Sequence, residues 1–332
     1  MRTVQLSGPQ GRRLAMVDER YLRLVDEWTS VYDMAQACAR SDRRVTTEIN
    51  SRLSAETLEY DEIYNAASEW RVLPSADHPA EPARCLVSGT GLTHTASART
   101  RQAMHGKEEE LTDSMRMYRW GLEGGKPAGN ELGVAPEWFY KGCGTILRGH
   151  GEPLVIPGHS SDGGEEPEIA AVYYIDAEGM PRRIGFTAGN EFSDHELEKK
   201  NYLYLAASKL RNCAIGPELA LDISFDHVPG EVSIERNGQK LWTKAIQSGE
   251  QVMSHSLANL EHHHFKFEEH RRPGDVHIHY LGADAFSFGD GIRLEDGDVM
   301  EVRFEGLGRP LRNPVRRIAK EQQSFRVRSL DF

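Results

Sequence analysis

The sequence predicts an α+β fold in which a small N-terminal α/β domain precedes a larger, strand-rich domain. Apolar runs of strand length dominate the second half of the 332-residue chain, and helical periodicity is confined to a few intervals. A weakly hydrophobic stretch with three prolines, at 73–82, separates the two regions. We therefore expect the small α/β domain to span residues 1–75 and the main domain to span residues 76–332.

The first 75 residues change from a strand pattern to a helix pattern. Apolar stretches at 4–6, 13–17 and 21–25 are divided by Gly-Pro and Asp-Glu pairs, which predicts a small β-meander. Between residues 32 and 67, apolar residues recur three and four positions apart. This spacing predicts helices, one of them in the segment ETLEYDEIYNAASEW.

The main domain is predicted to consist mostly of strands. A short strand at 85–87 comes first, and strand patterns dominate from Trp138 onward, where pairs such as Asn237-Gly238 supply tight turns. The other expected elements are a helical region at 96–122, a loop at 124–133 and helical intervals at 194–210 and 251–267.

The composition excludes several classes of protein. A formal charge of −11 argues against a general nucleic-acid or anionic-membrane binder, and the basic stretch 309–317 is interpreted as a solvated tail. No window approaches the ~20 apolar residues that a transmembrane helix needs, and no signal-peptide pattern is visible. The four cysteines are scattered without a CxxC pattern, so free thiols and a cytoplasmic location are expected.

Three glutamates close in sequence suggest a metal site. Glu166 and Glu168 lead into the apolar run IAAVYYI, and strand geometry places residues i and i+2 on one face. Glu191 ends the next strand, and hairpin pairing would bring it back beside them. Buried carboxylates need a positive partner, and oxygen ligands suit Mg²⁺, Mn²⁺ or Ca²⁺. On spacing alone, a solvated acidic loop is an equally good interpretation.

Lys209 closes the helical interval that follows Glu191. A lysine held near a metal-bound carbonyl group could have a lowered pKa or could serve as a fixed positive charge. Without the neighbouring glutamates, a surface lysine would be the better interpretation.

Over residues 85 to 316 the sequence resembles a known family, the fumarylacetoacetate hydrolase family. Each motif is weak alone, but all of them occur in the family's order. They are Pro136-Glu137-Trp138-Phe139-Tyr140-Lys141-Gly142, Glu166-Pro167-Glu168, the GFTAGNE strand ending at Glu191, Lys209 with Gly216-Pro217, and the turns at 272–276 and 294–299.

The resemblance implies a mixed β-roll catalytic domain that holds one Mg²⁺ or similar ion, in a homodimer. Carried over residue by residue, Glu166, Glu168 and Glu191 would be the metal ligands. Lys209 would face a small-molecule 2-oxo acid, and Glu137 would lie near a metal-bound water.

Two departures from the family pattern concern the site. Glu191 stands where aspartate is usual, and the loop that usually carries a substrate-binding threonine reads Leu-Gly-Ala-Asp here. The matched segments make Thr93, Lys141, Gly282 and Ala283 the expected substrate-binding residues.

The motifs resemble most the branch that dehydrates 2-keto-3-deoxy sugar acids of the pentonate or arabinonate type, through a metal-stabilised enolate. His94 is then a candidate acid for the departing hydroxide, although a simple loop histidine is as good an interpretation. Lys209 or a water linked to Glu137 would take the C3 proton. The alternative reaction is metal-dependent C–C bond hydrolysis of acylpyruvates or other 2,4-diketo acids.

Two interpretations from other classes stay open. His277 and His279 share a strand face, as a histidine metal site requires, but consecutive histidines at 262–264 cannot all reach one ion from a helix. Surface or interface roles are preferred for these histidines. The missing threonine near Ala283 motivates the second interpretation, a sugar-acid-binding protein without catalysis.

Overall fold

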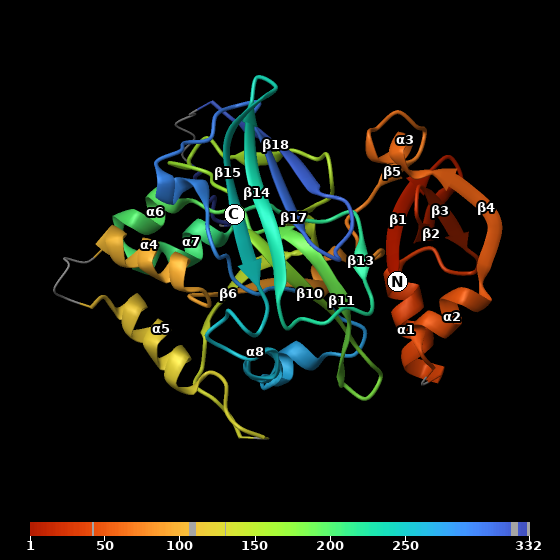
Figure 1. Cartoon of the computed structure of the whole chain (residues 1–332), viewed down its shortest axis with the longest axis horizontal. Helices are drawn as coiled ribbons and strands as arrows, with labels where there is room; N and C mark the ends of the chain where they lie inside the picture. Colours follow the sequence, from red (N-terminus) through yellow and green to blue (C-terminus); the bar gives the residue numbers. More distant parts are fainter. Residues whose placement is uncertain (42, 106–110, 130, 320–324, 331–332) are drawn as a thin grey trace.

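The computed structural model of the chain describes residues 1–41, 43–105, 111–129, 131–319 and 325–330. Among these residues, one sheet has thirteen strands and a second sheet has five (Figure 1). The strands follow the order β4-β3-β2-β1-β13-β11-β10-β16-β6-β7 along the main path of the large sheet, and β15-β14-β17-β18-β9 in the small one. In the described part of the chain, no helix has the length and apolar character needed to cross a bilayer.

The N-terminal residues form a meander with helices beside it. The elements are β1 (Arg2–Gly8), β2 (Gly11–Asp18), β3 (Tyr21–Val25), α1 (Val31–Ser41), α2 (Val45–Ser51), β4 (Leu53–Glu59), α3 (Tyr60–Tyr64) and β5 (Arg71–Val72). The predicted meander is confirmed, but of the helix expected across residues 56–70 only α3, Tyr60–Tyr64, is present. Residues 53–59 instead form β4, which pairs antiparallel with β3, so sheet pairing overrides the local helical pattern.

The other elements follow a proline-rich segment. Those up to the central hairpin are η1 (Pro82–Arg84), β6 (Cys85–Gly91), α4 (Thr95–His105), α5 (Asp113–Gly124), β7 (Glu137–Cys143), η2 (Gly144–Ile146), β8 (Leu147–Arg148), β9 (Leu154–Ile156), β10 (Pro167–Ile175) and β11 (Pro181–Asn190). The rest are α6 (His195–Lys200), η3 (Tyr202–Tyr204), α7 (Leu205–Lys209), β12 (Cys213–Ile215), β13 (Leu219–Ala220), β14 (Val228–Arg236), β15 (Gln239–Ser248), α8 (Leu257–Phe265), η4 (Glu268–Arg271), β16 (Val276–Tyr280), η5 (Ser287–Asp290), β17 (Val299–Phe304) and β18 (Leu311–Arg317).

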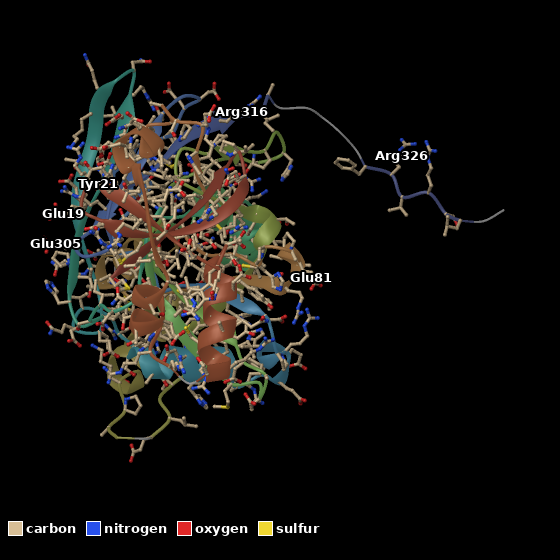
Figure 2. All side chains as sticks on the ribbon, turned by 90° about the vertical axis from the view of Figure 1, so that its right-hand side faces the viewer. Glu19, Tyr21, Glu81, Glu305, Arg316 and Arg326 are labelled. Atoms are coloured by element: carbon tan, nitrogen blue, oxygen red, sulfur yellow. The ribbon has the colours of Figure 1, made fainter. Side chains whose placement is uncertain are left out.

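Most expected elements of the main domain are present, with shifted boundaries. The helical region 96–122 becomes α4 and α5, and its residues 106–110 lie outside the described part, as does residue 130 of the expected loop. The interval 251–267 is helical only from Leu257. The basic stretch 309–317 is not a tail, because β18 pairs with β17 and β9 and buries alternate side chains. The chain leaves the body later, in the segment that carries Arg326 (Figure 2).

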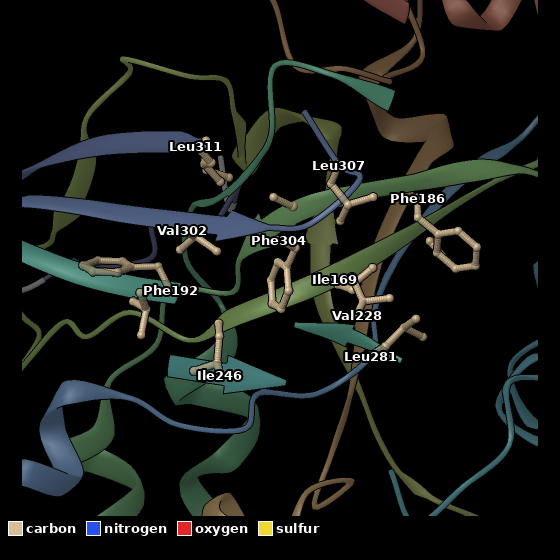
Figure 3. Packing of buried hydrophobic residues seen from close by; sticks show 14 of the residues in the cluster. Ile169, Phe186, Phe192, Val228, Ile246, Leu281, Val302, Phe304, Leu307 and Leu311 are labelled. Carbon is tan, nitrogen blue, oxygen red and sulfur yellow. The ribbon is translucent and has the colours of Figure 1, made fainter. Parts of the chain in front are cut away.

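The two sheets enclose the main hydrophobic core. Figure 3 shows Ile169 and Phe186 of the β10–β11 hairpin in the same cluster as Val302 and Leu311 of the small sheet. All nine residues of β10 are buried. The run IAAVYYI is therefore apolar without alternation because both of its faces are covered, one by the small sheet and the other by α1.

Histidines fill the space between α8 and strands β6 and β16. Of the three consecutive histidines only His264 is buried, as expected for a helix. Its Nε2 lies 2.9 Å from Nδ1 of His277, and Nε2 of His279 lies 2.6 Å from the hydroxyl of Thr90. Burial lowers the pKa of His277 and of His279 to about 3. Both imidazoles are therefore neutral in the folded protein above that pH.

These buried histidines predict a loss of stability on mild acidification. An unfolded histidine takes up a proton near pH 6.5, whereas folded His279 does so only near pH 3. Between these values the unfolded state binds one more proton, so the free energy of unfolding falls as pH falls, by up to about 1.4 kcal/mol per pH unit. His279→Gln, which keeps a hydrogen-bonding group for Thr90, should flatten this dependence in urea unfolding between pH 6 and 4. His227 is exposed, so His227→Gln is the control and should leave the pH dependence of stability unchanged. If His279→Gln also leaves this dependence unchanged, buried His279 is not its source.

Candidate active site

The β10–β11 hairpin brings three glutamates together. Its antiparallel register pairs Pro167 with Asn190, so Glu166 and Glu191 come next to each other just beyond the paired strands. The Glu191 amide donates a hydrogen bond of 2.9 Å to the Glu166 carbonyl. Ligand oxygens of Glu166, Glu168 and Glu191 all lie within 4.8 Å of one another, and all three residues are buried. The hairpin therefore produces the carboxylate cluster that the spacing suggested.

The donor chemistry of this cluster fits a hard divalent cation. Burial and the nearby charges of Glu191 and Glu166 raise the pKa of Glu168 well above its usual value. Burial also raises the pKa of Glu191 to about 7. Three buried carboxylates cannot all stay ionised so close together without added positive charge. Among the described residues, no histidine cluster meets the same geometric test for a metal site.

Lys209 supplies one positive charge to the cluster. Its Nζ lies 2.7 and 2.9 Å from the two carboxylate oxygens of Glu166 and 2.9 Å from Oε2 of Glu191. Burial alone would lower the pKa of Lys209, but these carboxylates and that of Glu198 raise it well above the usual value. The expectation of a lowered pKa is therefore wrong, and the alternative of a fixed positive charge agrees with the geometry.

A narrow cavity of about 20 Å³ lies on one side of the cluster. Its lining combines carboxylates, two basic side chains and an apolar wall: Gly91, Leu92, Ser97, Arg101, Glu137, Phe139, Glu166, Glu168, Lys209, Ala283 and Phe286.

Glu137 faces this cavity from the first residue of β7. Burial raises its pKa to about 7. Its Oε1 has no hydrogen-bond partner among the described residues, and a Cβ atom at Gly91 would lie only 1.8 Å from its Oε2. Glycine at position 91 is therefore needed for this carboxyl group to point into the cavity. A carboxyl group that titrates near neutrality can both accept and return a proton.

Lys141 occupies a different place from the one expected of a substrate-binding residue. Its Nζ is fully buried, 2.8 Å from Oε1 of Glu191, 2.7 Å from the Phe192 carbonyl and 3.0 Å from the Lys209 carbonyl. It is not among the described residues that line the cavity. Its ion pair holds Glu191 in place, and contact of Lys141 with substrate stays a prediction.

Thr93 and His94 are also absent from the described lining of the cavity. The Thr93 hydroxyl donates to the Leu281 carbonyl at 3.0 Å and lies 2.9 Å from Nδ1 of His94. Burial lowers the pKa of His94 to about 4, so its imidazole is neutral. The Thr93 side chain joins the β6 end to the loop after β16. The expected roles of Thr93 in binding and of His94 in catalysis stay predictions.

The loop after β16 takes part through its backbone. The Gly282 amide donates a 2.6 Å hydrogen bond to Oε2 of Glu168. Its φ of +100° favours glycine, and a Cβ there would lie 1.8 Å from the Thr93 hydroxyl. Gly282 therefore orients Glu168, whereas Ala283 lines the cavity as expected.

Sequence reasoning missed several residues of the site. His195 donates from Nε2 to Oε1 of the Glu166 carboxylate at 3.0 Å, and its ring stacks on Phe286. Arg101 and Glu198 form an ion pair of 2.8 Å at the cavity edge. These residues lie on short polar helices whose sequence resembles a solvated surface, so no sequence signal identified them.

Comparisons with known proteins agree with the motifs. No model of a protein family matches the sequence. A probable 2-keto-3-deoxyxylonate dehydratase of Haloferax volcanii is 27% identical over 182 residues, covering 52% of this chain and 58% of the relative. A 2-dehydro-3-deoxy-D-arabinonate dehydratase of Saccharolobus solfataricus is 28% identical over 202 residues, covering 56% and 61%. The chain thus matches less than two thirds of the length of either relative.

Solved structures share the fold over nearly the whole chain. A 2-keto-3-deoxy-D-arabinonate dehydratase complexed with magnesium and 2,5-dioxopentanoate superimposes with a TM-score of 0.71 at 19% identity, covering 96% of this chain and 100% of that one. A 5-carboxymethyl-2-hydroxymuconate delta-isomerase from Mycobacterium smegmatis gives 0.59 at 17% identity, with the same coverage. The expected α+β fold with a mixed β-roll is confirmed. The chain is thus similar in part of its sequence to two sugar-acid dehydratases, and it shares the fold of such a dehydratase and of an isomerase.

Proposed function

We propose that the protein is a metal-dependent hydro-lyase that dehydrates a 2-keto-3-deoxy sugar acid of the pentonate or arabinonate type. The observation that carries this proposal is the pairing of a carboxylate cluster with a proton-exchanging Glu137 across one small cavity. Both curated relatives are named as dehydratases of such acids, and one structural neighbour holds magnesium and 2,5-dioxopentanoate.

Glu166, Glu168 and Glu191 would hold the metal ion. A divalent cation bound there would supply the positive charge that a 2-oxo acid and its enolate need. Mg²⁺ is the proposed ion, and Mn²⁺ and Ca²⁺ share its preference for oxygen ligands. A homodimer and a cytoplasmic location stay predictions.

Glu137 is the proposed acid–base group. As a carboxylate it would take a proton from C3 of the substrate, and as a carboxylic acid it would return that proton to the hydroxyl leaving C4. Water is then lost between C3 and C4, and the unsaturated product tautomerises. A pKa of about 7 permits both halves of this exchange near neutral pH. Lys209, held as a cation by Glu166 and Glu191, would stabilise negative charge rather than remove a proton.

The lining of the cavity favours dehydration over the two alternatives. Hydrolysis of acylpyruvates needs a group to activate an attacking water, typically a histidine paired with a glutamate. His195 contacts lining residues, but its glutamate partner is Glu166, a proposed metal ligand. A binding protein without catalysis has no need of a carboxyl group held near its neutral-pH titration point, as Glu137 is.

Product analysis tests the reaction. With Mg²⁺ and 2-keto-3-deoxypentonates, mass spectrometry should show loss of one water to give a 2,5-dioxo acid. Glu168→Ala should abolish this activity but leave a folded protein, because it removes one metal ligand. The exposed Glu178→Ala serves as the control. Cleavage of acylpyruvates to pyruvate and a carboxylic acid, with pentonates left intact, would contradict the dehydratase proposal.

Glu137→Gln tests the acid–base assignment. We expect kcat/KM of the unaltered protein to rise with pH through about 7, because Glu137 must be ionised to take the C3 proton. The variant should lose about 10²- to 10⁴-fold in kcat and the ionisation near pH 7. Its Mg²⁺ affinity, measured by calorimetry, should stay the same. A variant that keeps the original pH profile would overturn the role of Glu137.

Lys209→Met tests the competition between cations. The ammonium group contacts oxygens of Glu166 and Glu191, so it opposes a divalent ion at the same carboxylates. The variant should bind Mg²⁺ about tenfold or more tightly in calorimetry while losing turnover. Lys240→Met removes an exposed lysine and is the matched control. Weaker Mg²⁺ binding in Lys209→Met would show instead that the lysine organises the ligands.

A further inference from the structure

Arg101 presents unused hydrogen-bond donors to the cavity. It lies on α4, is 8% exposed and lines the same space as Glu137. Its Nη2 is 2.8 Å from Oε2 of Glu198, whereas its Nε and Nη1 are buried and have no hydrogen-bond partner among the described residues. Three of the five N–H donors of the guanidinium group therefore have no acceptor. Leaving charged donors buried and unsatisfied is unfavourable, and such groups commonly mark a ligand contact.

Residues packed against α4 hold the guanidinium group of Arg101 in position. Glu198 accepts a 2.6 Å hydrogen bond from the Ser208 hydroxyl, and its Oε1 lies 3.5 Å from Nζ of Lys209. The Tyr202 ring lies under the guanidinium carbon at 5.0 Å. These contacts come from the packed elements α6, η3 and α7, beside α4 in Figure 1. An arginine fixed in this way binds a ligand without first losing side-chain freedom.

The other described groups that line the cavity are less suited than Arg101 to bind an anion. Lys209 already contacts oxygens of two glutamates and of Ser193. Ala283 and Phe286 offer no polar side-chain atom, and Glu137 repels negative charge when ionised. Arg101 is thus the described cationic group of the lining that retains free donors.

We propose that Arg101 binds the carboxylate of the 2-oxo acid substrate and so selects acids over neutral carbonyl compounds. This inference rests on the proposed function, which supplies the 2-oxo acid. A carboxylate would give the three free donors charged acceptors in a nearly water-free site, where charge-assisted hydrogen bonds are strongest.

Calorimetry with pyruvate and with pyruvamide, both in the presence of Mg²⁺, separates this role from a structural one. The two probes differ in charge and not in the 2-oxo group. The unaltered protein should bind pyruvate more tightly, and Arg101→Gln should weaken pyruvate binding about ten- to hundredfold. Pyruvamide binding should change less than about twofold. Arg101→Lys, which keeps the charge, should recover part of the loss.

Two further variants keep the test decisive. Because Arg101→Gln leaves Glu198 without its arginine partner, Arg101→Gln/Glu198→Gln provides a version in which no unpaired charge is created at this position. Arg236→Gln removes an arginine paired with Asp298, away from the cavity, and should bind both probes normally. Equal losses for pyruvate and pyruvamide, or no preference for pyruvate in the unaltered protein, would overturn the proposal. If pentonates are not dehydrated but Arg101 still confers the preference for pyruvate, the proposed function fails and this inference stands.

Discussion

The antiparallel pairing of β10 with β11 is the interaction on which the site depends. Its register is fixed by the hydrophobic core, because alternate residues of β10 face the small sheet and the side of α1. A slip of one residue would turn Glu168 to the opposite face and separate Glu166 from Glu191. The energy that specifies this register comes from apolar burial rather than from the carboxylates, which repel one another. Packing thus places three charges where electrostatics alone would keep them apart.

Some of the buried carboxyl groups around the cavity have a cationic partner and others do not. Three cations pair with carboxylates of the site. Lys141 pairs with Glu191 and Arg101 with Glu198, whereas Lys209 contacts Glu166, Glu191 and Glu198. Glu168 and Glu137 have no ion pair of their own among the described residues, and burial raises the pKa of both. The first of these lies within the proposed metal cluster and the second is the proposed acid–base group. The unmatched charge is therefore concentrated at the two positions where a metal ion and a proton would supply the balance.

The sequence was sufficient for the hairpin and its glutamates, because side chains alternate between the two faces of a strand and the turn position fixes which strand ends meet. The sequence was not sufficient to predict which of the site's side chains line the cavity and which are buried away from it. Lys141 and Glu137 both lie on β7, yet Lys141 pairs with Glu191 outside the described lining, whereas Glu137 lines the cavity. The part played by Arg101 and Glu198 could not be predicted for a different reason, because their ion pair joins helices that are far apart in the sequence. Local propensity likewise could not show that residues 53–59 would pair with β3.

The segment at 73–82, which resembles a linker in sequence, is instead part of the support for the site. Ser75 is fully buried, its amide donates to the Gly216 carbonyl at 3.3 Å, and its hydroxyl donates to that of Thr187 on β11 at 3.1 Å. Gln5 of β1 donates to the Pro74 carbonyl, and β13 pairs with both β1 and β11. The N-terminal strands are therefore hydrogen-bonded into the sheet that carries the glutamates. Because Glu191 directly follows β11, the N-terminal residues are bonded to the strand that positions one glutamate of the carboxylate cluster.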